Sequence, residues 1–90
     1  MERHTALRGW QPCELSFDCK QVTIRDPSGA DSDEVVPVKS LTSVCPIDVM
    51  MAGAEFVFAM KNHTGKAFWF KAPDVRSFVE WLTALQGAVL

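Results

Sequence analysis

The chain has 90 residues, 48% of them hydrophobic and 22% charged, so it can bury one core but not two and is too apolar for a disordered tail. Its formal net charge of −2 supplies no global positive field, which excludes nucleic acid as an expected partner. The composition therefore predicts a single domain over residues 1–90.

Cysteine and histidine usage argues against a metal centre and a disulfide framework. Cys13, Cys19 and Cys45 are an odd number without CxxC spacing, and the chain has only two histidines. Nothing resembles a signal peptide, and no apolar run approaches the roughly 20 residues that span a bilayer. We expect reduced thiols, no cofactor and a cytoplasmic location, with a peripheral position at membranes as the alternative.

The first half of the chain reads as short strands separated by polar loops. From Trp10 to Arg25, apolar and polar residues alternate on either side of a polar corner at Asp18–Lys20, which predicts a half-buried hairpin of two strands. The run from Asp26 to Asp33 combines turn formers with like charges and predicts an exposed loop. Between Glu34 and Val49, β-branched residues return, but two prolines remove ladder donors, so two short strands are predicted.

The strongest strand signal lies between Glu55 and Lys71, where two aromatic-rich segments flank a turn at Asn62–Gly65. Alternation places one set of apolar side chains on the inner face of this hairpin. These residues are Phe56, Phe58 and Met60 on the first strand and Phe68 and Phe70 on the second. By the same alternation, Trp69 points outward and is predicted to be either a partner anchor or a ring covered by a loop.

The C-terminal segment has the apolar period of a helix. We predict this helix from about Pro73 to Gln86, with Pro73 in its first turn, Asp74 favourable to the dipole and Gly87 as its stop. The apolar residues at helical spacing are Val75, Phe78, Val79, Leu82, Leu85 and Val89.

Short antiparallel strands followed by one terminal helix suggest a sheet whose open mouth the helix covers. The run Phe68–Ala72, followed nine residues later by Trp81 with Leu82 and Leu85 beyond it, resembles the end of a pleckstrin-homology (PH) domain. The resemblance extends weakly over nearly the whole chain and is specific only from Glu55 onward. The alternative is an unrelated α+β domain.

The resemblance implies a mainly β fold, a PH-like antiparallel β-barrel or sandwich capped by the C-terminal helix. Trp81 would then be structural, because a large ring on the inner helix face fills the barrel mouth. The expected structural core is Phe17, Phe56, Phe58, Phe68, Phe70, Phe78, Trp81 and Leu85.

No arrangement of residues predicts catalysis, since neither histidine has a nucleophile at a suggestive position. In the PH family, inositol phosphates are usually held by a basic cluster around the end of the first strand, the following loop and the second strand. The corresponding stretch, Ala6 to Glu14, offers only Arg8. The residues predicted for headgroup or anion contact, with solvated surface as their default role, are Arg8, Lys61, Lys66 and Lys71.

Only nine residues precede Trp10, which leaves room for at most a short first strand at about Arg3 to Leu7. We therefore expect an incomplete sheet whose exposed edge pairs with a partner, a neighbouring domain or a second copy in a homodimer. The predicted function is a non-catalytic adaptor or scaffold for protein–protein interaction within a larger signalling or trafficking protein. The alternatives are a phosphoinositide-binding membrane-recruitment domain and a regulatory segment of an enzyme.

Overall fold

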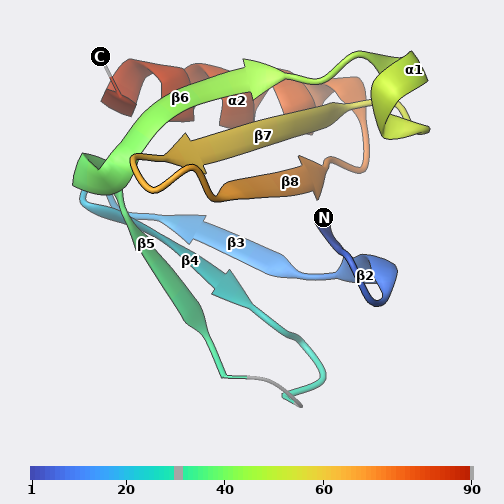
Figure 1. Cartoon of the computed structure of the whole chain (residues 1–90), viewed down its shortest axis with the longest axis horizontal. Helices are drawn as coiled ribbons and strands as arrows, with labels where there is room; N and C mark the ends of the chain where they lie inside the picture. Colours follow the sequence, from blue (N-terminus) through green and yellow to red (C-terminus); the bar gives the residue numbers. More distant parts are fainter. Residues whose placement is uncertain (30–31, 90) are drawn as a thin grey trace.

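The computed structural model describes residues 1–29 and 32–89 and is mainly β. The strands are β1 (Glu2–Thr5), β2 (Gly9–Pro12), β3 (Glu14–Phe17), β4 (Gln21–Arg25), β5 (Glu34–Pro37), β6 (Leu41–Pro46), β7 (Val57–Asn62) and β8 (Ala67–Lys71). The helices are the short α1 (Val49–Ala52) and the long C-terminal α2 (Val75–Val89), with a 3-10 turn at Val38–Ser40. The strands form two antiparallel sheets, ordered β2-β1-β8-β7-β6 and β3-β4-β5 (Figure 1).

The stretch of residues 9–17 contributes to both sheets. β2 pairs with β1 in the five-stranded sheet, and β3 pairs with β4 in the three-stranded sheet. The chain crosses between the sheets at the buried Cys13, whose backbone N–H donates to the Met1 carbonyl at 2.9 Å. The predicted polar corner then returns the chain into β4, with Cys19 at a φ of 75° and the Asp18 carboxylate accepting from two backbone N–H groups.

The short first strand for which the sequence leaves room is present, at Glu2–Thr5 and not at about Arg3 to Leu7. β1 forms over Glu2–Thr5 and is paired on both sides, with Arg3 opposite Gln11 of β2 and opposite Phe70 of β8. A strand of four residues persists here because its hydrogen bonds are shared with two neighbours and not with one. β1 therefore has no open edge, and the terminal strand on this side of the sheet is β2.

The sheets do not close into a barrel, because among the described residues β5 and β6 are not paired with each other. The edges of β5 and β6 are nevertheless protected. β5 has four residues and ends in Pro37, and short or proline-containing strands resist pairing with another chain. The edge of β6 faces α2, where the Gln86 side-chain amide donates to the Val44 carbonyl at 3.0 Å. β5 and β6 correspond to the two short strands predicted between Glu34 and Val49.

The predicted aromatic hairpin is present as β7 and β8, and Gly65 in its turn has a φ of 90°. Phe56 does not share a strand face with Phe58, however, because β7 begins one residue later. The chain turns out of α1 into β7 at this point, which places Phe56 in the left-handed region with a φ of 61°. Its ring lies against Phe78 of α2, with ring centroids 6.2 Å apart.

The core lies between the two sheets and under α2. Its largest fully buried side chains are Phe58, Phe70, Met60, Leu85, Val22 and Val57. Phe68 is also buried, whereas Phe17, Phe78 and Trp81 are half-buried and pack against this core. Figure 1 shows α2 running along β6, so one helix covers the side of the sandwich where the sheets are not joined.

The limits of α2 differ from the predicted ones. The helix passes through Gly87 and ends at Val89, which packs against the core. That packing outweighs the cost of about 1 kcal/mol that glycine carries in a helix interior. At the other end, the Asp74 carboxylate accepts from the Ser77 N–H at 2.8 Å, so Asp74 is the N-cap and Pro73 lies outside the helix.

Replacing Asp74 with alanine is expected to lower the free energy of unfolding by about 1 kcal/mol, because one N-terminal N–H of α2 loses its acceptor. Urea denaturation followed by tryptophan fluorescence measures the change. Asp74→Ser keeps a capping oxygen and should recover most of the loss. Equal destabilisation by both substitutions would show that the cap is not the source of the effect.

Candidate anion-binding pocket

A cavity of about 550 Å³ opens between the turn that joins β1 to β2 and the loop that follows β4. One wall is formed by β1, the turn and β2, and the other by the end of β4 and the residues after it. Figure 1 shows the β1–β2 turn at the lower right, well separated in that view from α2 at the top. The cavity is therefore remote from the helix that covers the core.

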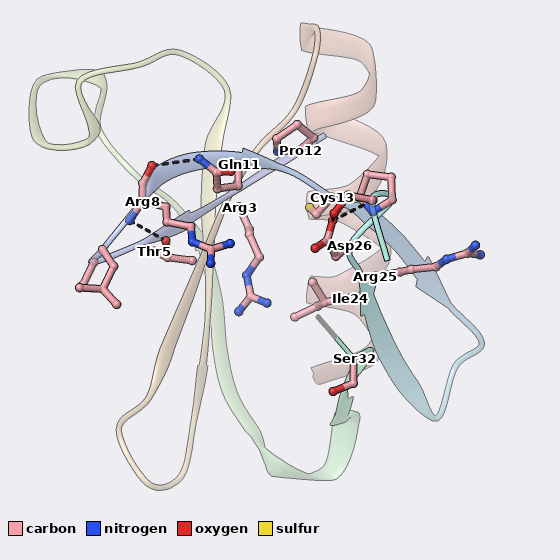
Figure 2. Close-up of a pocket in the computed structure, with 14 residues that line it drawn as sticks. Arg3, Thr5, Arg8, Gln11, Pro12, Cys13, Ile24, Arg25, Asp26 and Ser32 are labelled. Atoms are coloured by element: carbon pink, nitrogen blue, oxygen red, sulfur yellow. Dashed lines mark hydrogen bonds between the residues drawn. The ribbon is translucent and has the colours of Figure 1, made fainter. Parts of the chain in front are cut away.

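Two arginines from the first wall line this cavity. Arg3 lies directly opposite the fully buried Phe70, and opposed residues share a sheet face, so it points to the inner side of the five-stranded sheet. Arg8 lies in the turn, which is fixed by the Arg8 N–H donating to Thr5 Oγ1 at 3.1 Å and by Gln11 Nε2 donating to the Arg8 carbonyl at 3.0 Å. Figure 2 shows both guanidinium groups extending into the same part of the cavity.

Arg3 is held in place by Glu34 at the start of β5. Arg3 Nη2 donates to Glu34 Oε1 at 3.0 Å, and Lys66 Nζ donates to Glu34 Oε2 at the same distance. Partial burial raises the pKa of the Glu34 carboxyl, but the hydrogen bonds and charges of Lys66 and Arg3 outweigh it and leave the pKa below its ordinary value. Glu34 is therefore ionised at neutral pH.

The opposite wall supplies buried apolar side chains and a third, outward-facing cation. Ile24 and Cys13 are buried at the base, and burial raises the pKa of the Cys13 thiol, which keeps it neutral. Arg25 also lines the cavity, yet Figure 2 shows its guanidinium directed away from the other two arginines. It lies 3.8 Å from the exposed carboxylate of Glu14. The cationic part of the pocket is thus the pair Arg3 and Arg8.

The lysines singled out from the sequence do not gather around Arg8. Lys66 is bound to Glu34 and lies over the Phe68 ring, 4.8 Å from its centroid. Lys71 pairs with Glu2 at 2.9 Å on the outer sheet face, and Lys61 is exposed on β7. Within the described part of the chain, the cavity lining includes none of the three.

Trp69 lies on the outer face of the five-stranded sheet and is half-buried. Its ring centroid is 6.2 Å from that of His4 on β1, and His4 meets Trp10 of β2 edge-on at 5.2 Å. Lys71 lies over the Trp10 ring, 5.2 Å from its centroid. Trp69 therefore lies beside aromatic side chains of the N-terminal strands.

The described residues contain neither a candidate metal site nor a candidate membrane-spanning helix. No three His, Cys, Asp or Glu side chains at positions 1–29 and 32–89 are grouped so as to hold a metal ion. Over the same positions, no helix combines the length and the hydropathy needed to cross a bilayer. The arginine-lined cavity is therefore the strongest candidate for a functional site in the described residues.

Comparison with known proteins identifies the fold family. The chain matches the family model of the PH domain over residues 4–90. Among curated proteins, "Putative serine/threonine-protein kinase A" of Trypanosoma brucei brucei is 24% identical over 82 residues. Those residues make up 91% of this chain, which spans only 19% of the length of that relative.

Solved structures show the same architecture at low identity. The C-terminal PH domain of human pleckstrin has a TM-score of 0.79 and 17% identity, with 98% of this chain and 74% of that chain covered. The same pleckstrin domain in complex with D-myo-Ins(1,2,3,5,6)P5 has a TM-score of 0.77 and 17% identity, with 99% and 89% covered. The chain therefore belongs to the PH domain family, whose members are generally non-catalytic modules for binding proteins or lipids.

Proposed function

We propose that this chain is a recruitment module that binds the polyphosphorylated headgroup of a phosphoinositide in the pocket of Arg3 and Arg8. The observation that carries the proposal is the convergence of these two guanidinium groups in one cavity of about 550 Å³, a size typical of small-molecule sites. A guanidinium donates two parallel N–H bonds to a phosphate, which favours arginine over lysine for this task. Pleckstrin's PH domain, of the same fold, is complexed with an inositol pentakisphosphate.

The tip of the β1–β2 turn supports a membrane source for that headgroup. Leu7 is 97% exposed, the most exposed of the large hydrophobic side chains in the described chain, and it lines the cavity next to Arg8. A leucine fully in water forgoes about 1.5–3 kcal/mol that burial in an apolar phase provides. With the headgroup in the pocket, this turn would face the bilayer and Leu7 would enter its apolar region.

Replacing Leu7 with asparagine is expected to weaken binding to phosphoinositide vesicles by about tenfold or more, because the apolar contact with the acyl chains is lost. Binding of a soluble inositol phosphate should not change. Vesicle flotation and calorimetry measure the two affinities. Met50→Asn is the matched control, since Met50 is 89% exposed but lies on α1 outside the cavity lining.

The direct test of the proposed function is flotation with vesicles carrying each phosphoinositide at physiological salt, beside calorimetry with soluble inositol hexakisphosphate. Saturable, headgroup-selective vesicle binding supports the proposal. Binding of the soluble ligand alone would identify a free inositol phosphate as the ligand.

If a folded sample binds neither the vesicles nor the soluble ligand, the proposal is contradicted. It would favour the protein–protein adaptor role predicted from the sequence, for which the His4, Trp10 and Trp69 face is the surface to probe.

A further inference from the structure

Glu34 stands between two cations that come from the other sheet. Its own strand, β5, belongs to the three-stranded sheet, whereas Arg3 is on β1 and Lys66 immediately precedes β8 in the five-stranded sheet. Each carboxylate oxygen accepts one bond of 3.0 Å, from Arg3 Nη2 and from Lys66 Nζ. The Glu34 side chain is 32% exposed and that of Arg3 is 27% exposed, so water weakens this network only in part.

A carboxylate and a phosphate oxygen are acceptors for the same donors. An anion that binds Arg3 must therefore share the guanidinium with Glu34 or displace it, and in either case it meets a fixed negative charge. Displacement would also release Lys66; neither Lys66 nor Glu34 lines the cavity, and Glu34 is linked to it through Arg3. A ligand with one phosphate gains too little binding free energy from the cations to overcome the repulsion by Glu34. A ligand with several phosphates gains more binding free energy from the same cations.

We propose that Glu34 is a specificity-determining competitor, an internal anion that restricts the pocket to ligands carrying several phosphate groups. The inference rests on the proposed function and names the residue that sets how many phosphate groups a ligand needs in order to bind. It also gives Lys66 a role as a second cation that becomes available when Glu34 is displaced.

The test is calorimetry with inositol hexakisphosphate and with inorganic phosphate, using wild type, Glu34→Gln and Glu80→Gln. The control changes the net charge by the same amount, and its exposed carboxylate pairs at 3.1 Å with Arg76 of α2, outside the cavity lining. Glu34→Gln should bind the hexakisphosphate about tenfold more tightly than wild type and gain measurable affinity for phosphate. Glu80→Gln should stay within about twofold of wild type.

Lys66→Gln separates competition from a structural role. In the wild-type background it should change hexakisphosphate affinity little, but in the Glu34→Gln background it should remove a large part of the gain. If Glu34→Gln does not fold, the wild type supplies the test through the carboxyl ¹³C shift of Glu34, which should move on titration with the hexakisphosphate.

The outcomes separate the two proposals. Wild-type binding with an unchanged or weaker Glu34→Gln variant, or an unmoved Glu34 signal, would overturn the competitor role and leave the proposed function intact. Binding by Glu34→Gln but not by wild type would support the competitor role. Binding by neither folded protein would overturn both.

Discussion

Replacing Arg8 with glutamine is expected to weaken the binding of inositol hexakisphosphate by about ten- to one-hundred-fold. Hydrogen bonds to a charged partner contribute about 1.5–3 kcal/mol each, and the substitution removes the guanidinium that the turn directs into the cavity. The turn itself should persist, because it is fixed by the backbone N–H and carbonyl of Arg8. Isothermal titration calorimetry at physiological salt gives the two dissociation constants.

Arg76→Gln is the matched control, because Arg76 lies on α2, pairs with Glu80 at 3.1 Å and is 88% exposed. It should bind as wild type does. The double variant Arg3→Gln with Arg8→Gln should show no measurable binding while remaining folded, which thermal unfolding checks. A double variant that binds normally would place the ligand outside this cavity.

Replacing Phe70 with alanine is expected to lower the free energy of unfolding by about 3–5 kcal/mol. Phe70 is fully buried, lies 5.6 Å from Phe58 between ring centroids, and pairs with residues of both β1 and β7. The substitution leaves a cavity at the centre of the five-stranded sheet. Because small domains are stable by only about 5–15 kcal/mol, the variant should lie close to unfolding. Urea denaturation measures the change.

Val79→Ala provides the reference for that experiment. Val79 is 52% exposed on α2, so its truncation creates no cavity and should change stability by less than about 0.5 kcal/mol. A Phe70→Ala variant whose free energy of unfolding falls by as little as that of Val79→Ala would contradict the assignment of Phe70 to the core.

The hairpin of β7 and β8 and the helix α2 were predictable because their signals are local. Alternation over Phe68 and Phe70 fixes the buried face of a strand, and apolar spacing around Leu85 fixes the buried stripe of a helix. The boundaries of these elements depend on contacts outside the elements themselves. The passage of α2 through Gly87 depends on Val89 reaching the core, and the left-handed Phe56 depends on the unpredicted α1 before it.

The pocket was only partly predictable, because its cations are far apart in the sequence. Arg8 could be singled out from the stretch that the family resemblance indicates. Arg3 was overlooked as a ligand candidate because the sequence left room only for a short first strand, and local patterning does not reveal the two neighbours that stabilise β1. The bond from Arg3 to Glu34 spans 31 positions, and no periodicity in the sequence predicts it.

The most direct test of the central claim is a titration of the ¹⁵N-labelled chain with soluble inositol hexakisphosphate, followed by two-dimensional NMR. The account predicts saturable shift changes at the amides of Arg3, Thr5, Arg8 and Gln11, with those of the outer-face residues Trp69 and Lys71 unmoved. Changes confined to Lys61, Lys71 and Trp69, or no changes at all in a folded sample, would contradict it.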